Sequence, residues 1–189
     1  LAPLPWMATL PVMGYVVGGA LSTPLVARAQ ARLGRKRSFQ LGLLVAMFAA
    51  ALCAAAALRG NFWLLVAATV IAGFYNANAY LYRFAATELA APAFKERAIS
   101  MVLAGGIVGA FAGPNLANAT RTLLGVPFAG AYVALIAVAL LSLLLLSLIE
   151  FPAHQPPAAG APGGRPLAEI ARQPAFIVAV LASAVGYGV

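Results

Sequence analysis

The chain has 189 residues, of which 63% are hydrophobic and only 8% are charged, and its formal net charge is +8. Soluble domains carry about 25% charged residues, so this composition excludes an ordinary soluble protein and indicates a membrane protein. The basic residues fall in short gaps between apolar runs, which favours membrane topology over nucleic-acid binding as the reason for the positive charge.

Long apolar runs dominate the chain. A membrane-spanning helix needs about 20 mostly apolar residues, and five complete runs and the start of a sixth meet this requirement. The runs are too long and too uniform for the strands of a membrane barrel. The sequence therefore predicts an all-α transmembrane fold, a helical bundle with five complete membrane helices and the start of a sixth. The predicted spans are residues 7–27, 38–58, 62–86, 98–120, 128–149 and 175–189.

The gaps between the spans predict the orientation of the bundle. Ten of the twelve Lys and Arg residues lie in the alternate gaps 28–37, 83–97 and 165–172, and only Arg59 and Arg121 lie in the others. The positive-inside rule places the first set of gaps in the cytoplasm. The first span then runs from outside to inside, and we interpret the chain as an internal piece of a longer protein.

The first two spans differ in pattern. The first carries Gly14, Gly18 and Ser22 at a spacing of four residues, which places them on one helix face. Small residues on one face allow a second helix to approach closely. The second span, 38–58, is almost entirely Ala, Leu, Val and Phe. We expect this uniform helix, like the similar span 128–149, to face lipid.

The third span is the most polar. On a continuous helix, Asn76, Tyr80, Arg83 and Thr87 fall within about 60° of one another. Polar residues in a membrane span face a bundle interior or a wet cavity. Hydrogen bonding between helices, together with an interfacial aromatic belt, is the alternative. We predict that this helix lines a solute cavity through Tyr75, Asn76, Asn78, Tyr80 and Arg83.

The fourth span carries a second ladder of small residues, Gly105, Gly109 and Gly113, followed by Pro114. The ladder predicts close approach of another helix, either as a moving contact or as static packing. Proline removes a backbone donor and weakens the helix, so the Gly-Pro step predicts a kink or a hinge.

The gap 150–174 is longer than the others. Its first part is rich in Pro, Gly and Ala and predicts a flexible linker, and Pro166 and Pro174 enclose a short predicted helix. The sequence thus predicts an N-terminal helical bundle at 1–149, a cytoplasmic linker, and the start of a C-terminal transmembrane half at 175–189.

Two motifs and the linker resemble the major facilitator superfamily of secondary transporters. The family's loop between its second and third helices reads Gly-x-Leu-x-Asp-Arg-x-Gly-Arg-Arg/Lys, and "ARAQARLGRKRS" matches it at Arg32, Gly34, Arg35 and Lys36, with Ala31 in place of Asp. The fifth-helix motif Gly-x-x-x-Gly-Pro-x-x-Gly-Gly is matched at Gly109, Gly113 and Pro114. The linker falls where the family joins its two six-helix halves.

The resemblance implies that the chain covers the family's second to seventh helices. It implies that the third span lines the substrate cavity, that the first and fourth face the opposite half, and that the second and fifth are peripheral. It also implies that two motifs control conformation, through Arg32, Gly34, Arg35 and Lys36 and through Gly105, Gly109, Gly113 and Pro114. The substitution of Ala31 puts the usual locking of that loop in question.

The resemblance implies secondary active transport of a small organic solute by alternating access. It gives proton-coupled export as the first expectation, because the Gly-Pro helix is typical of the family's proton-coupled exporters. Import or facilitated passage of a metabolite is the alternative within the superfamily, and a structural or sensor protein without flux is a distant one. An enzyme is excluded because the spans show no cluster of catalytic groups. We expect no metal and no cofactor, apart from possible coupling to protons. Any proton-carrying carboxylate would lie outside the visible spans, unless Glu88 serves.

The expected partners are the solute, the lipid bilayer and the helices of the same chain that are missing here, and not nucleic acid. The expected location is the inner membrane of a bacterium, as a multi-pass protein.

Overall fold

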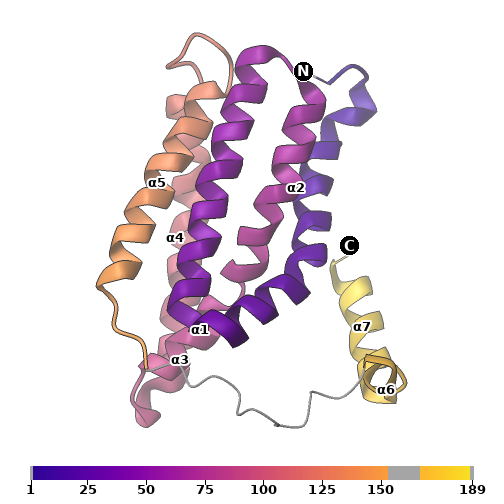
Figure 1. The fold of residues 1–189 in the computed structure, drawn as a ribbon, viewed down its shortest axis with the longest axis vertical. Helices are drawn as coiled ribbons and strands as arrows, with labels where there is room; N and C mark the ends of the chain where they lie inside the picture. Colours follow the sequence, from indigo (N-terminus) through magenta and orange to yellow (C-terminus); the bar gives the residue numbers. More distant parts are fainter. Residues whose placement is uncertain (1, 153–166, 188–189) are drawn as a thin grey trace. The chain divides into compact units, whose positions relative to one another are not determined.

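The computed structural model describes residues 2–152 and 167–187. The chain divides into two compact units, Leu1–Pro156 and Pro157–Val189. The first unit is a bundle of helices whose order along the chain can be followed in Figure 1. Its elements are η1 (Pro5–Thr9), α1 (Leu10–Arg59), α2 (Phe62–Ala79), α3 (Tyr82–Leu89), η2 (Pro92–Phe94), α4 (Lys95–Thr120) and α5 (Ala129–Leu148).

The 50 residues of α1 form two helices joined at a sharp bend. A straight helix of this length would extend about 75 Å, more than twice the hydrocarbon thickness of about 30 Å. Gly34 breaks the helix with φ 79° and ψ 171°, a backbone conformation that essentially only glycine adopts. The two parts of α1 therefore correspond to the first two predicted spans, and together with the other long apolar helices they confirm the all-α transmembrane fold.

The next connection is short and well capped. Gly60 ends α1 in the left-handed conformation, with φ 65°. Glycine adopts this conformation without steric strain because it has no Cβ. The side chain of Asn61 then accepts a hydrogen bond of 3.0 Å from the backbone N–H of Leu64 and caps the start of α2. These two residues turn the chain into an antiparallel hairpin.

The predicted third span, 62–86, is not one continuous helix. It is interrupted at Tyr80 and Leu81, between α2 and α3. The N–H of Leu81 bonds the carbonyl of Asn78 at 2.9 Å. This bond spans three residues, as in a 3-10 turn, and not the four residues of an α-helix. The Asn78 side chain also donates to the carbonyl of Phe74 at 3.2 Å, and such local bonds compete with regular helix. The interruption separates the two ends of the predicted polar stripe.

The first glycine ladder packs against α2. A Cβ placed on Gly18 would lie 2.0 Å from the carbonyl oxygen of Val70, and one on Gly73 would lie 2.3 Å from the backbone of Gly18. The two helices therefore cross with their backbones in contact, as small residues allow in membranes. Gly14 also lies on this interface, because its added Cβ would meet the Thr69 side chain at 2.9 Å. This ladder serves packing inside the bundle.

The second part of α1 does not simply face lipid, contrary to expectation. One face is exposed, but the other contributes much of the core of the first unit, including Phe39, Leu43 and Cys53. Phe39 stacks on Tyr82 with ring centroids 4.4 Å apart. A uniformly apolar sequence does not separate a core-facing from a lipid-facing side, because both environments favour the same residues.

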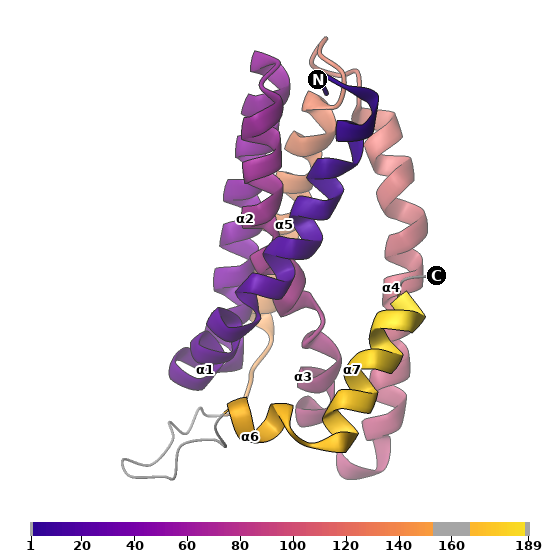
Figure 2. The same cartoon turned by 90° about the vertical axis from the view of Figure 1, so that its right-hand side faces the viewer.

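Helix α4 differs from the other long helices in its burial. It contacts α3 and α5, and Figure 2 shows it at the edge of the bundle, apart from α2. Within residues 2–152, none of its side chains is buried. Apolar residues on a helix with so few neighbours must face lipid or further helices in the membrane.

The second unit contains the short helix α6 (Leu167–Ala171) and the apolar helix α7 (Pro174–Tyr187). Both begin within or directly after the predicted short-helix segment. Most of the predicted linker, residues 153–166, lies outside the described residues.

Candidate functional site

The predicted cavity residues lie at the end of α2 and around the break that follows it. Tyr75 lines a cavity of about 280 Å³ between α1, α2 and α5. The walls are mostly apolar, and the polar groups among them come from two further tyrosines, Tyr15 and Tyr132, and from hydroxyl or thiol side chains. Such mostly apolar clefts with few polar groups are typical of small-molecule sites. The non-tyrosine polar groups are Cys53, Thr69 and Ser142.

Tyr15 of α1 and Tyr75 of α2 line this cavity together with Tyr132 of α5. Tyr80 follows the end of α2, and its side chain is 60% exposed. Tyrosine rings offer a flat face for stacking and a hydroxyl for hydrogen bonding. These rings can therefore contact a planar aromatic group.

The two asparagines have different environments. Asn78 is completely buried and accepts a hydrogen bond of 3.2 Å from Ser38 on α1. It packs on Gly42, whose added Cβ would meet the Asn78 side chain at 3.1 Å. Asn76 is half-buried beside Gly19. The structure thus places Asn78 in a helix interface, whereas Asn76 retains access to the space beside α2.

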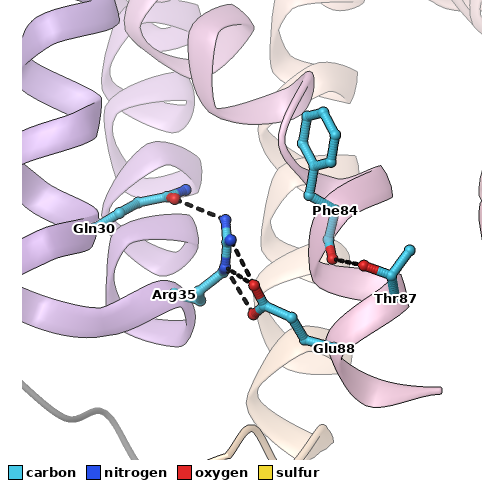
Figure 3. Close-up of polar contacts among 5 residues, drawn as sticks. All are labelled: Gln30, Arg35, Phe84, Thr87 and Glu88. Carbon is cyan, nitrogen blue, oxygen red and sulfur yellow. Dashed lines mark hydrogen bonds and ion pairs between the residues drawn. The ribbon is translucent and has the colours of Figure 1, made fainter. Parts of the chain in front are cut away.

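Arg83 lies beyond the break and is exposed. Its guanidinium lies over the ring of Phe84, 5.0 Å from the ring centroid. Thr87 donates to the carbonyl of Phe84 at 2.7 Å, within its own helix (Figure 3). Arg83 and Thr87 thus lie on α3, after the irregular turn at Tyr80 and Leu81, and the face that they were predicted to share with Asn76 and Tyr80 stays a prediction.

The loop motif makes specific contacts at the bend of α1. Arg35 forms a fork-like ion pair with Glu88 of α3, with its Nε 2.8 Å from one carboxylate oxygen and its Nη2 2.5 Å from the other (Figure 3). Its Nη1 also donates to the side-chain oxygen of Gln30 at 2.9 Å. Both ends of the pair are partly exposed, so water screens it and its contribution to stability is about 1 kcal/mol or less. Its value lies in geometry, because two parallel bonds fix an orientation.

The other motif residues have three different environments. Gly34 forms the bend described above, which we call the joint. Lys36 donates to the carbonyls of Ser147 and Ile149, at 2.9 and 2.8 Å. Arg32 is exposed on α1. The motif therefore ties α1 to both α3 and α5 within two consecutive residues.

The second ladder has a different environment from the first. Added Cβ atoms on Gly105, Gly109 and Gly113 would meet nothing within 4 Å among the described residues. Gly109 and Gly113 line a groove of about 520 Å³ between α4 and α5. Helix α4 continues through Pro114 without interruption. The ladder is thus an open, smooth face on a continuous helix.

Sequence reasoning missed Tyr15 and Ser38, and it treated Tyr132 as part of a lipid-facing helix. A single tyrosine in a long apolar run is a weak signal by itself. These residues became visible as partners only once α1 and α5 were placed beside α2. Within residues 2–152 and 167–187, no three His, Cys, Asp or Glu side chains form a group that could hold a metal.

The sequence profile of the Major Facilitator Superfamily matches residues 4–189. The chain is similar to the riboflavin transporter RfnT of Brucella anthropi, with 38% identity over 185 residues, which are 97% of this chain and 46% of that protein. The chain thus spans about half the length of this relative.

Two proteins of Bacillus subtilis are also similar. YddS, an uncharacterized MFS-type transporter, is 30% identical over 131 residues, which cover 67% of this chain and 30% of that protein. YdeG, described in the same words, is 30% identical over 134 residues, which cover 69% of this chain and 31% of that protein. All three relatives are named as transporters and not as enzymes, and four helices in the described part of this chain are long and apolar enough to cross a membrane. The chain belongs to the Major Facilitator Superfamily.

Proposed function

We propose that the full-length protein is a secondary transporter which moves a small organic solute across the membrane by alternating access. The observation that carries this proposal is the family match over nearly the whole chain, together with 38% identity to a riboflavin transporter. The proposed location is the inner (plasma) membrane of a bacterium, because the relatives come from bacteria.

The proposed solute is a planar aromatic molecule, with riboflavin as the first candidate because of the Brucella relative. The exposed ring of Tyr80 and the cavity-lining rings of Tyr15 and Tyr75 support this choice, since stacked aromatic pairs contribute about 0.5–1.5 kcal/mol beyond burial. Asn76, which is half-buried, and Arg83, which is exposed, carry hydrogen-bond donors. The proposed solute-binding residues are therefore Tyr75, Asn76, Tyr80 and Arg83, with Tyr15 added and with Asn78 supporting them from the helix interface.

Direction and coupling are separate parts of the proposal. The Gly-Pro helix is the feature typical of proton-coupled exporters, and export by proton antiport is the first candidate. Import or facilitated passage of a metabolite is the second, because a riboflavin transporter is the relative with 38% identity. Glu88 is the acidic residue nearest the cavity helix, and it is paired with Arg35. We propose that any proton carrier in a membrane span belongs to helices outside this chain.

The open ladder of α4 has a proposed role in the transport cycle. We propose that Gly109 and Gly113 contact a further membrane helix of the full-length protein, in the opposite half as the resemblance implies. The groove beside the ladder supports close approach from that side. Arg32, Gly34 and Arg35 are proposed to control the conformation at the bend.

Transport is testable with the full-length protein in lipid vesicles. We expect riboflavin flux above that of empty vesicles, and a response to an imposed pH gradient if protons are coupled. Tyr80→Leu is expected to raise the KM about three- to tenfold through lost stacking, whereas Tyr80→Phe keeps the ring and most of the affinity. Asn76→Leu is expected to lower transport more than it lowers the yield of folded protein.

Leu44→Ala, on the exposed face of α1, is the control for a general effect of substitution. Folded protein that moves neither riboflavin nor any other small solute would contradict the transport proposal. Normal KM values in Tyr80→Leu and Asn76→Leu would leave transport standing and remove these residues from the site.

A further inference from the structure

The C-terminal end of α5 lacks a glycine cap. Its last residue is Leu148, and Ile149 follows in an extended conformation with φ −82° and ψ 128°. The last four carbonyls of any helix have no partner within the helix. A glycine in the left-handed conformation often satisfies some of them, but Ile149 does not have that conformation. The N–H of Ile149 bonds the carbonyl of Leu146 at 3.2 Å, and the carbonyl of Ser147 takes its donor from another helix.

Lys36 supplies such a donor from a segment more than one hundred residues away. Its ammonium bonds the carbonyls of Ser147 and Ile149, at 2.9 and 2.8 Å. A lysine has three N–H donors and can serve both acceptors at once. Its positive charge also faces the negative end of the α5 dipole. One side chain thus satisfies the helix end by hydrogen bonding and by charge.

Two further contacts hold the same place. Gln40, one turn after Lys36, donates to the side-chain oxygen of Ser147 at 3.1 Å. The ring of Phe151 lies against that of Phe39, with centroids 6.2 Å apart. The three contacts come from consecutive turns of α1 and act on residues 147–151. They therefore fix both the last turn of α5 and the chain directly after it.

Lys36 lies where α1 contacts two other helices. It is adjacent to Arg35, which holds α3 through Glu88, and it follows the joint at Gly34 by two residues. The first turn of α1 after Gly34 is thus attached both to α3 and to the end of α5. A movement of α1 at this end would carry the end of α5 with it.

We propose that Lys36 is a positioning residue: it clamps the C-terminal end of α5, and the start of the segment that leaves the bundle, to the turn of α1 after Gly34, so that these parts move as one body. The effect on transport rests on the proposed function, whereas the clamp itself does not. The proposal concerns Lys36 and α5, and it is independent of the solute.

Distances between spin labels test the clamp directly. Labels are placed at the exposed positions Phe48 on α1 and Glu150 after α5, in the full-length protein without other accessible cysteines. A single narrow distance distribution is expected with Lys36 and with Lys36→Arg, which keeps the charge and the donors. Lys36→Met keeps the apolar stem and loses the donors, so the distribution is expected to broaden.

Arg37→Met is the matched control, because Arg37 is the exposed neighbour and its removal also costs one positive charge. In transport, Lys36→Met is expected to lower the maximal rate about fivefold, the equivalent of one charged donor lost from a helix end. The KM for the solute is expected to stay unchanged, and Lys36→Arg to restore the rate.

A distribution that stays narrow in Lys36→Met would overturn the proposal, as would equal broadening in Arg37→Met. If no variant and no wild-type protein transports a solute, but the distances behave as expected, the proposed function fails while the clamp is supported.

Discussion

Single residues determine where this chain turns, and Gly34 is the clearest case. It lies between two helical segments with φ 79° and ψ 171°, and it is buried at the bend. Gly60 has a comparable role at the opposite end of the second segment, with φ 65°. Both residues permit a backbone conformation that side chains with a Cβ strongly disfavour. The antiparallel path of the first two spans therefore depends on two glycines.

Replacement of Gly34 by alanine is expected to destabilise the protein by about 1–3 kcal/mol, the usual cost of a residue held in this glycine-only region. The measurement is the midpoint of thermal unfolding of the full-length protein in detergent, followed by the loss of monodisperse protein. Gly106→Ala is the control, because its added Cβ meets nothing within 4 Å in the described part of the chain. Equal midpoints for the two variants would show that the bend tolerates a Cβ.

Helices built from similar glycine ladders are used in different ways in this bundle. The ladder of Gly14 and Gly18 is covered by α2, with backbone against backbone at Gly73. The ladder of Gly109 and Gly113 is open along a groove beside α5. A small residue at every fourth position creates a smooth helix face, but this pattern does not predict which helix will pack on it. The two ladders differ only in the contacts that the structure shows for them.

Leucine substitutions separate the two ladders experimentally. Gly18→Leu is expected to reduce the yield of folded protein severely, because its Cβ alone would lie 2.0 Å from the backbone of Val70, and overpacking of this kind costs about 1–3 kcal/mol or more. Gly109→Leu is expected to leave insertion and folding nearly unchanged, while it lowers transport and shifts the accessibility of cysteines on the two sides of the membrane.

Val108→Leu is the control for Gly109→Leu, because Val108 is 68% exposed on the same helix. The measurements are the yield of monodisperse protein and the transport rate in vesicles. Normal transport by Gly109→Leu would contradict a moving contact at this ladder and favour a static role for it.

At the scale of the whole molecule, the first unit has one end where basic residues and helix contacts coincide. Arg35 bonds Glu88 and Lys36 bonds the end of α5 at the bend of α1. The positive-inside rule assigns this end to the cytoplasm, and the opposite end holds Arg59 and Arg121 as its basic residues. Orientation and helix contacts thus depend partly on the same side chains.

Cysteine labelling tests this orientation. In a Cys53→Ala background, Arg59→Cys is expected to react with an impermeant thiol reagent added to intact cells, and Arg37→Cys only after the cells are opened. Both positions are exposed and lie outside the ion pair of Arg35 and the left-handed turn at Gly60. Labelling of position 37 but not of position 59 in sealed cells would reverse the orientation.

The sequence by itself determined the properties that depend on local composition. Runs of about 20 apolar residues require helices in a bilayer, because each backbone group must find its partner within the helix. The all-α transmembrane fold and the superfamily followed from these runs and from motifs such as that of Gly34 to Lys36. The turn at Gly34 also follows from chemistry within one residue, although the sequence analysis did not use it.

Only the tertiary structure decided which side chains meet. The burial of Asn78 against Ser38, the pairing of Arg35 with Glu88 and the bonds of Lys36 all join residues at least forty positions apart. Periodicity predicted a polar stripe on this helix, but it could not predict the bond of Asn78 to Ser38 on another helix or its local bond to Phe74. Apolar sequence specifies that a helix lies in the membrane, but lipid and protein neighbours are equally apolar, so its neighbours are selected by shape and by a few polar contacts.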